Sequence, residues 1–321
     1  MPIPRRHLLA ASALLCLPAL AQPAPYPAKP VRFIVPFAAG GGSDTMARLV
    51  AQKLNEKHGY TIVVENKPGA GGNLGAEAAL REPADGYTLL VISGSYAGNA
   101  VVSKPSFDSV AAIQPIVQFT REPSVLIVDQ ESPFRTLKDL TDKARSAPGT
   151  VAYGTSGVGG LAHLSTEYFA SVAGIRINHV PYKGTSAALV DLASGQIQLM
   201  FGGTTSVAPL VKGGRVRPLA VAASARLASM PQVPTFAELG LAGFRADLWH
   251  GLVAPRGTPP QVIAKLNADV NAVLRSPEMA ARLAADDVQP GGGTPEQFAE
   301  VIRSDMERWR TIVKEADIRL N

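Results

Sequence analysis

The residues of this sequence best suited to chemistry are glycines and hydroxyl side chains that follow a short apolar run. The β-prone run Phe33–Val35 stops at Pro36, three glycines follow at 40–42, and a helical pattern begins at Ser43 or Asp44. Consecutive glycines let the backbone turn sharply and bring its N–H groups close to a ligand. A helix start leaves about four amide donors without partners and carries a partial positive charge. This order therefore predicts a binding site for an anion.

Similar loops recur along the chain, each between a predicted strand and a predicted helix. They lie at 66–73, 154–160 and 181–186. A single loop of this kind explains no more than a tight turn, but several favour one shared ligand site at the carboxyl ends of the strands. The loops contain no arginine, and apart from Lys67 their one positive charge is Lys183. We therefore expect binding through backbone amides, hydroxyls and bridging water. The expected aromatic walls are Phe37, Tyr96, Tyr182 and Phe201.

Signatures of enzymes are largely absent. The sequence has no G-x-x-x-x-G-K-[ST] phosphate loop, no G-x-S-x-G elbow and no H-E-x-x-H motif. Residues 69–75 resemble a dinucleotide fingerprint, but its third glycine is one position late. His163 and Glu167 stand one helical turn apart and could bind a metal, yet a third ligand is missing and a surface pair is the simpler interpretation. His179 and His250 are interpreted as packed, hydrogen-bonded side chains. We expect no catalytic residue, no metal and no cofactor.

The first 21 residues have the pattern of a cleaved secretory signal. A basic pair at 5–6 precedes an apolar run at 8–20, and small residues stand at 19 and 21. The run is too short to span a bilayer comfortably, so we expect cleavage near Ala21 and export to the periplasm, by the general or the twin-arginine route. Cys16 is the only cysteine and leaves with this segment. The mature chain would then have no cysteine nucleophile and no Cys-ligated metal.

Composition indicates a packed globular protein. The 321 residues suffice for two domains of ordinary size, and 46% of them are hydrophobic and 18% charged. The net charge of +5 is spread along the chain, and it falls to +3 when Arg5 and Arg6 are removed. No Lys/Arg stripe alternates with aromatic residues, which argues against nucleic acid as a partner.

Predicted strands and helices alternate, which is typical of parallel βαβ construction. Separate strands are expected around 115–119 and 125–128, and Thr136 is expected to cap a helix. Capping boxes with proline, at 258–261 and 294–297, predict two terminal helices. The last helix places a single apolar stripe on one face, which must be buried. The stripe consists of Phe298, Ile302, Trp309, Ile312 and Ala316.

A terminal helix pair without strands of its own packs most simply on the first domain. The chain is therefore expected to leave the first lobe near Pro123 and to return near Trp249. This division gives lobe one at 22–123 and 249–321 and lobe two at 124–248. Two crossovers of this kind form a hinge between lobes.

Short motifs of one family pattern extend over nearly all of the mature sequence. They are PFAAGGGSD at 36–44, ENKPGAGGN at 65–73, DGYTL at 85–89, GTSG at 154–157 followed by His163-Leu164, HVPYKG at 179–184, VPT at 233–235, WHGL at 249–252 and APRGTP at 254–259. With these motifs the chain resembles the Bug family, the periplasmic solute-binding receptors of tripartite tricarboxylate transporters.

The resemblance implies an α/β fold with two lobes of the type II periplasmic-binding-protein kind. Each lobe would be a mainly parallel sheet flanked by helices, and the lobes would close on a ligand by hinge motion. The family implies carboxylate ligands, held by loop amides and ordered water, and membrane permease subunits as partners of a monomer. After Phe201 the family commonly has Asp, and Gly202 stands there in this chain. This difference argues against an ammonium-binding role and favours a plain carboxylic acid over an amino acid.

We therefore expect a receptor that captures a di- or tricarboxylic acid or a related organic acid and delivers it to a permease. A ligand-sensing protein that acts in signalling is the alternative, and a secreted hydrolase or isomerase that uses His163 or His250 is the weaker one. The identity of the acid, its affinity and the permease stay open. The expected ligand-binding residues are Phe37, Ala38, Ala39, Gly40, Ser43, Gly72, Asn73, Ser93, Ser95, Thr155, Ser156, Gly157, His163, Tyr182, Gly184 and Phe201.

Overall fold

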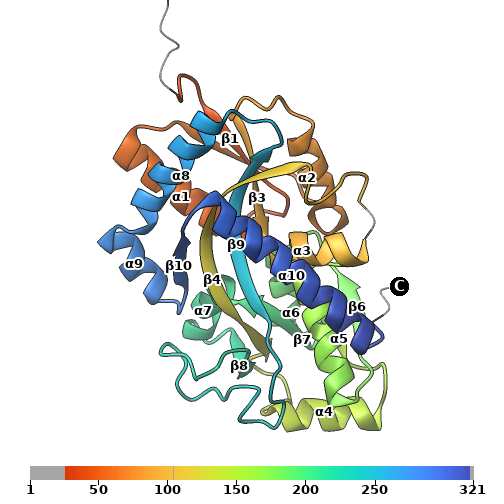
Figure 1. Ribbon diagram of the computed structural model, residues 1–321. Helices are drawn as coiled ribbons and strands as arrows, with labels where there is room; N and C mark the ends of the chain where they lie inside the picture. Colours follow the sequence, from red (N-terminus) through yellow and green to blue (C-terminus); the bar gives the residue numbers. More distant parts are fainter. Residues whose placement is uncertain (1–25, 104, 319–321) are drawn as a thin grey trace, which may run out of the picture.

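Strands and helices alternate along most of the chain (Figure 1). The computed structural model describes residues 26–103 and 105–318, so the expected signal segment at 1–21 lies outside the described residues. The strands are β1 (Val31–Val35), β2 (Ile62–Asn66), β3 (Thr88–Ser93), β4 (Ile113–Asp129), β5 (Ala152–Thr155), β6 (Asn178–Pro181), β7 (Leu199–Gly203), β8 (Val216–Val221), β9 (Asp247–Pro255) and β10 (Gln289–Gly292). The helices are α1 (Gly42–His58), α2 (Asn73–Leu80), α3 (Gly94–Val102), α4 (Leu137–Ser146), α5 (Leu161–Ala173), α6 (Thr185–Ala193), α7 (Thr204–Lys212), α8 (Pro260–Leu274), α9 (Pro277–Ala284) and α10 (Pro295–Glu315).

The described strands join into a mixed sheet of two halves. Its order is β2-β1-β3-β9-β4-β7-β5-β6, and β10 and β8 also pair with β4. In one half β1 pairs in parallel with β2 and β3, and in the other half β5 pairs in parallel with β6 and β7. Parallel neighbours need a crossover connection, which is usually a helix. Helix α1 makes this connection between β1 and β2, and α5 makes it between β5 and β6. The carboxyl ends of β3 and β7 likewise lead into the starts of α3 and α7.

Each half buries both faces of its sheet. In the half that contains β1, a core beneath α1 and α8 lies on one face, and a core beneath α2, α3 and α10 lies on the other. In the half that contains β5, the corresponding cores lie beneath α4 and α5 and beneath α6 and α7. Strands that are apolar on both faces suit this arrangement, and all six residues of β3 are buried.

Strand β4 belongs to both halves. Its residues up to Pro123 pair antiparallel with β9, whereas the residues from Ser124 onward pair with β7 and β8. The prediction of separate strands around 115–119 and 125–128 is wrong, because β4 continues through all 17 residues. Pro123 has no N–H group, but the pairing with the segment before β9 continues past it: the N–H of Ser124 donates to Ala246 O (3.1 Å). β4 and β9 therefore lie side by side through the centre of the molecule (Figure 1).

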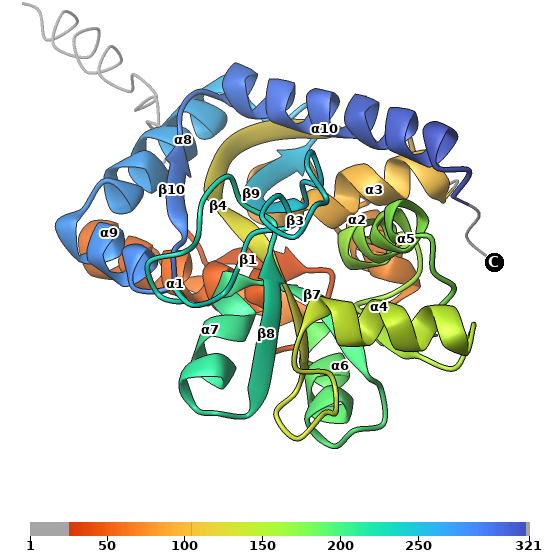
Figure 2. The ribbon, with the colours of Figure 1, turned by 90° about the horizontal axis from the view of Figure 1, so that it is seen from below.

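Helix α10 extends over the sheet from the side of α8 to the side of α5 (Figure 2). Thr294 and Gln297 form the predicted capping box at its start. The predicted stripe is buried at Phe298, Ile302 and Trp309. The capping box predicted at 258–261 is wrong, because Pro259 is the N-cap of α8 and the Thr258 hydroxyl donates to Pro255 O (2.8 Å). In the part of the chain that the structure describes, no helix combines the length and apolar character needed to cross a membrane.

We predict that Trp309→Ala lowers the free energy of unfolding by about 3–5 kcal/mol. Trp309 is fully buried and packs against Leu161 and Leu164 of α5, so truncation leaves a cavity between α10 and α5. Denaturant unfolding followed by circular dichroism measures the change. The control is Arg310→Ala at an exposed position of the same helix, which should change stability by less than about 0.5 kcal/mol. Equal stability of the two variants contradicts the prediction.

Candidate functional site

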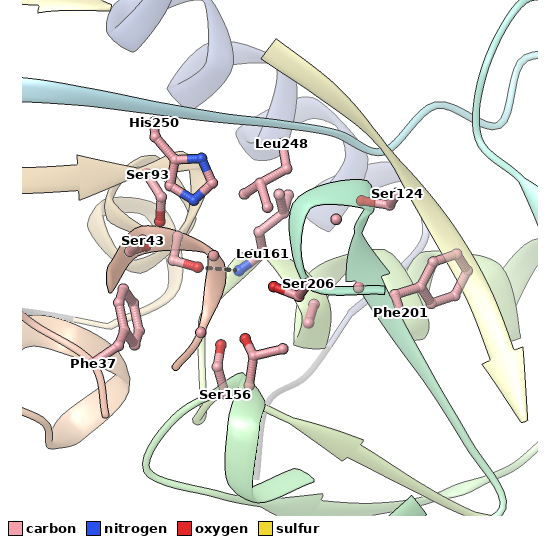
Figure 3. Close-up of a pocket in the computed structure, with 17 residues that line it drawn as sticks. Phe37, Ser43, Ser93, Ser124, Ser156, Leu161, Phe201, Ser206, Leu248 and His250 are labelled. Carbon is pink, nitrogen blue, oxygen red and sulfur yellow. Dashed lines mark hydrogen bonds between the residues drawn. The ribbon is translucent and has the colours of Figure 1, made fainter. Parts of the chain in front are cut away.

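Several helices begin at one cavity (Figure 3). Among the described residues, α1, α3, α5, α6 and α7 each place a residue of the N-cap or first turn in its wall. The cavity holds about 550 Å³ of space free of protein atoms, including the part open to solvent. The positive ends of these helices favour an anion. The wall consists of Phe37, Gly41, Gly42, Ser43, Ser93, Ser95, Ser124, Ser156, Leu161, Ala162, Thr185, Phe201, Gly202, Gly203, Ser206, Leu248 and His250.

None of these helix starts is capped by the side chain of its own N-cap residue. The N-cap residues are Gly41, Ser93, Gly160, Gly184 and Gly203. Helices α4, α9 and α10, which are absent from the cavity wall, are each capped by a Ser or Thr hydroxyl. Two of the first turns at the cavity have other partners: Leu161 N–H donates to Ser95 Oγ (3.1 Å), and Thr205 N–H donates to Glu122 Oε2 (2.5 Å). The starts of α1, α3 and α6 are therefore best placed to donate to a ligand.

The cavity wall is polar without being charged. Among its residues only His250 has a side chain that titrates near neutral pH. Hydroxyl groups come from both halves, and apolar surface comes from Phe37, Phe201, Leu161 and Leu248 (Figure 3). Such a site can hold an anion with backbone amides and hydroxyls, and it can cover an uncharged carbon skeleton with its apolar side chains.

Six of the residues expected from the sequence line this cavity. They are Phe37, Ser43, Ser93, Ser95, Ser156 and Phe201. The other expected residues lie in the surrounding loops or in the strand and helix ends next to them, and they do not form its wall. The start of α3 directly after β3 was not expected, because the sequence around Gly94 resembles a loop. This helix start explains why Ser93 and Ser95 lie at the cavity.

The loops of the two halves touch at the rim. The N–H of Ala38 donates to Lys183 O (3.2 Å), and Ser186 Oγ donates to Ala39 O (2.8 Å). Gly184 packs so closely on this loop that a β-carbon there would lie 2.9 Å from Ala38 N. The expected residues Ala38, Ala39 and Gly184 therefore make contacts between the halves.

Three further expected residues shape the first-half loops. The sequence favours Asp44 as the cap of the first helix, but the N-cap is Gly41. Gly40 N–H donates to Asp44 Oδ2 (2.9 Å), so Asp44 bonds the backbone just before α1. A β-carbon on Gly72 would lie 3.1 Å from the ring of Phe37, which places Gly72 directly beneath this wall residue. Asn73 is the first residue of α2.

The expected residues of the second half stabilise the loop between β5 and α5. Gly157 N–H donates to Thr155 Oγ1 (3.2 Å), and Gly159 N–H donates to His163 Nδ1 (3.1 Å). The ring of His163 stacks on that of His179 with 3.7 Å between centroids. Tyr182 donates from its hydroxyl to an acidic side chain of α6, Asp191 (2.6 Å). These side chains hold the loop that presents Ser156 to the cavity.

The geometry also decides what His163 and Glu167 do. Glu167 accepts a hydrogen bond from the Tyr153 hydroxyl, whereas His163 is engaged by Gly159 and His179. The two side chains thus have different partners, and no group of three or more His, Cys, Asp or Glu residues in the described ranges is arranged to hold a metal ion.

The wall residues that the sequence analysis missed are of two kinds. Thr185 and the glycines at 41–42 belong to loops that were recognised, and Gly202, Gly203 and Ser206 belong to a further segment rich in Gly and Thr at 202–206, so composition was an available signal for all of them. Leu161 and Ala162 lie just after such a loop. Ser124, Leu248 and His250 lie on or next to the strands that join the halves. Nothing in their local sequence shows that the pairing of β4 with β9 brings them to the cavity.

A buried glutamate, Glu122, lies behind His250. Glu122 Oε1 is 3.5 Å from His250 Nδ1, and Thr120 Oγ1 is 3.2 Å from the same nitrogen. Both side chains are almost fully buried, at 1% exposure or less. Burial raises the pKa of Glu122 to about 7, against the hydrogen bonds from Thr204 and Thr205 that favour its charged form. Burial also lowers the pKa of His250 to about 4.

Comparison with known proteins gives the family. The model of the tripartite tricarboxylate transporter family receptor matches residues 46–318. The chain belongs to this receptor family. Among solved structures, periplasmic binding protein BugD is 30% identical with a TM-score of 0.87, covering 92% of this chain and 99% of BugD. The predicted resemblance to the Bug family and the predicted α/β fold with two lobes are confirmed.

Two similar solved structures contain ligands. Rpa4515 of R. palustris with adipate is 36% identical with a TM-score of 0.88, and the match covers 91% of this receptor and 99% of Rpa4515. MatC of Rhodopseudomonas palustris with bound malate is 31% identical with a TM-score of 0.86, and the match covers 90% of this receptor and 100% of MatC.

We predict that low pH lowers the free energy of unfolding of this receptor through its buried histidines. Burial, with a smaller contribution from His179, lowers the pKa of His163 to about 3. Between pH 6.5 and pH 3 the unfolded chain therefore binds more protons than the folded one, and stability falls as pH falls. His163 alone should lower the free energy of unfolding by about 2 kcal/mol between pH 7 and pH 5.

The measurement is denaturant unfolding of the receptor and of His163→Asn at pH 7 and pH 5. Asn can still accept a hydrogen bond from Gly159 N–H, but it does not titrate. The loss of stability between the two pH values should be smaller in the variant by about the amount given above. An unchanged loss shows that His163 does not titrate on unfolding in this range.

Proposed function

We propose that this protein is a periplasmic receptor that captures a small organic acid as its carboxylate and delivers it to a membrane permease of the tripartite tricarboxylate type. The observation that carries the proposal is the meeting of uncapped helix starts in one uncharged cavity. Adipate and malate, bound by the related Rpa4515 and MatC, are both carboxylates. Carboxylate oxygens accept hydrogen bonds from several N–H and O–H donors at once, which suits this wall.

The wall favours an acid without an ammonium group. Neither Asp nor Glu is among the wall residues, and Gly202 stands where the family commonly has Asp. A buried ammonium group would have no counter-charge among the wall residues and would lose its hydration. The aromatic rings of Phe37 and Phe201 and the side chains of Leu161 and Leu248 suit an apolar carbon chain. We therefore infer a di- or tricarboxylic or related organic acid and not an amino acid.

The two halves act as lobes that close on the acid. We place lobe one at 22–123 and 249–321 and lobe two at 124–248. The change of partners in β4 between Pro123 and Ser124 supports this division. The remaining predicted site residues contribute by holding the loops and the contacts between lobes. Domain closure around a ligand needs a few hinge residues between two rigid bodies.

Export, partner and activity follow the family pattern. We infer that residues 1–21 are a cleaved signal peptide, that the mature protein works in the periplasm as a monomer, and that it needs no cofactor and no metal. A similar structure, BugD, is a periplasmic binding protein. We further infer that the protein binds its ligand without chemical turnover. Closure would present a different surface to the permease subunits, because ligand binding shifts the balance between open and closed forms.

We predict that the purified protein binds a carboxylate and returns it unchanged. Isothermal calorimetry with adipate, malate, citrate and the amino acids aspartate and glutamate tests this proposal. At least one plain acid should bind with a Kd of about 10 μM or tighter, and the amino acids about tenfold or more weakly. Mass spectrometry of the recovered acid should show no conversion. Folded protein that binds no acid of a broad panel contradicts the receptor function, and conversion of the acid contradicts its non-enzymatic nature.

We predict that Gly184→Ala weakens acid binding tenfold or more, which is about 1.4 kcal/mol or more. The φ of Gly184 is 162°, an extended value that any residue adopts, so the added methyl group disturbs only the contact with Ala38 of the other lobe. Calorimetry measures the affinity, and thermal unfolding checks the fold.

The matched control for Gly184→Ala is Ser186→Ala, two residues further on in the first turn of α6. It removes the hydrogen bond to Ala39 O without adding bulk, so it should cost about 1 kcal/mol or less of binding energy. Full affinity of Gly184→Ala shows that the lobes need not approach this closely.

A further inference from the structure

His250 lies between the ligand cavity and a buried acid. Its ring forms part of the cavity wall, beside Ser93 (Figure 3). A β-carbon on Gly42, the first residue of α1, would lie 3.4 Å from both Nε2 and Cε1 of His250, so this edge of the ring faces the helix start. The opposite nitrogen, Nδ1, faces Thr120 and Glu122. A proton on Nδ1 thus points toward Glu122, and a proton on Nε2 points toward the cavity.

Glu122 has one oxygen bonded and one oxygen without a partner. Oε2 accepts hydrogen bonds from Thr204 Oγ1 (3.0 Å) and Thr205 N–H (2.5 Å) at the start of α7. Oε1 is buried and has no hydrogen-bond partner among the described residues, although His250 Nδ1 is 3.5 Å away. A buried oxygen of this kind is costly unless it accepts a proton from a neighbour or carries one itself. Two neighbouring groups can supply or share a proton there: the imidazole ring of His250, which also borders the cavity, and the Thr205 hydroxyl, which is itself buried without a partner.

The charge of Glu122 therefore decides which nitrogen of His250 carries the proton. When Glu122 is ionised, a proton on Nδ1 faces its negative oxygen, and the bare Nε2 can only accept a hydrogen bond. When the pair holds one more proton, Nε2–H faces the cavity as a donor, whether the extra proton lies on Oε1 or on the imidazole. A carboxylate oxygen of a ligand needs the form with Nε2–H as a donor. A hydroxyl group of a ligand can donate to the form with a bare Nε2.

Other charges near the pair are balanced locally. Asp286 raises the pKa of Glu122 in the same direction as burial does, but it is itself paired with Lys212 (2.9 Å) and Arg282 (2.6 Å). On the neighbouring strand positions Arg121 and Asp247 pair with each other at 3.7 Å. In the first turn of α1, Asp44 is paired with Arg48 (3.0 Å). The positive end of α7 favours the ionised form of Glu122. The bound anion is thus the one new charge that closure would bring to the pair.

We propose that His250 contacts the bound acid through Nε2 and that Glu122 behind it sets the proton position, so that capture of a carboxylate takes up one proton from solvent onto the Glu122–His250 pair. This inference rests on the proposed receptor function, because it needs an acid in the cavity. His250 is then a specificity-determining residue and Glu122 a positioning residue. A negative ligand raises the proton affinity of a nearby carboxylate, which couples binding to protonation. The cavity thereby receives anion and proton together.

The first test needs no ligand. Nitrogen-15 NMR of histidine-labelled protein at pH 8.5 reports which nitrogen of His250 is protonated, with the signal assigned by its loss in His250→Gln. We expect the proton on Nδ1 in the natural protein and on Nε2 in Glu122→Gln, because the amide NH₂ of Gln can donate to Nδ1. The control is Glu278→Gln, which removes an exposed carboxylate of α9 and should leave the signal unchanged. The same tautomer in both the natural protein and Glu122→Gln overturns the proposal.

The second test is calorimetry with adipate and malate in buffers of different ionisation enthalpy. Because the pKa of Glu122 is about 7, about 0.8 proton should be taken up per acid at pH 7.5, and the Kd should rise about fivefold from pH 7 to pH 8. Glu122→Gln should show neither effect. His250→Gln keeps a donor that does not titrate and serves as a second variant, and it should take up less proton than the natural protein, because only the direct charge effect of the ligand on Glu122 is left. Glu278→Gln should behave like the natural protein.

Failures of the two proposals are distinguishable. Binding of an acid without proton uptake, or with equal uptake in Glu122→Gln, overturns the role of the pair and leaves the receptor function intact. If neither adipate nor malate nor any acid of the panel binds, the receptor function fails, and the NMR measurement still decides how Glu122 controls His250.

Discussion

Backbone N–H groups without a capping side chain meet at one cavity, and the other features of the site follow from them. A buried donor without a partner costs about 1–3 kcal/mol, and helix ends of the same sign that converge also repel one another. One carboxylate relieves both penalties. The wall can therefore do without Arg or Lys, whose burial would add a desolvation cost of its own. Glycine N-caps, as at α1 and α6, keep these donors free.

The second constraint is that the halves share strands. β4 pairs with β9 before Pro123 and with β7 and β8 after it, so one hydrogen-bonded ladder passes from one half to the other. Ser124, Leu248 and His250 come to the cavity from this crossing. Movement of one half relative to the other would change the position of these residues relative to the helix starts. Ligand contacts and lobe position are thereby linked through backbone hydrogen bonds.

A buried carboxylate beside an anion site is an electrostatic conflict. Glu122 is fully buried, and burial and the bound anion both oppose its charge. The start of α7 opposes this tendency, since two of its donors bond Oε2. The balance keeps both protonation states of Glu122 accessible near neutral pH. A stronger partner of Glu122, such as Arg, would keep Glu122 ionised at all pH values near neutrality. His250 Nε2 could then act only as a hydrogen-bond acceptor toward the cavity.

Local interactions determined what the sequence could predict. The glycines at 40–42 mark the start of α1, the Thr294 capping box marks the start of α10, and the period of Phe298, Ile302 and Trp309 shows its buried face, because each signal depends on neighbours within a few residues. Thr258 shows that such a signal also fails when a nearby carbonyl takes the hydroxyl. Only the tertiary structure decided that β4 is continuous and that His250 reaches the cavity. His250 reaches the cavity because it pairs with Thr120, which is 130 positions away in the sequence. Long-range pairing of this kind has no local signature.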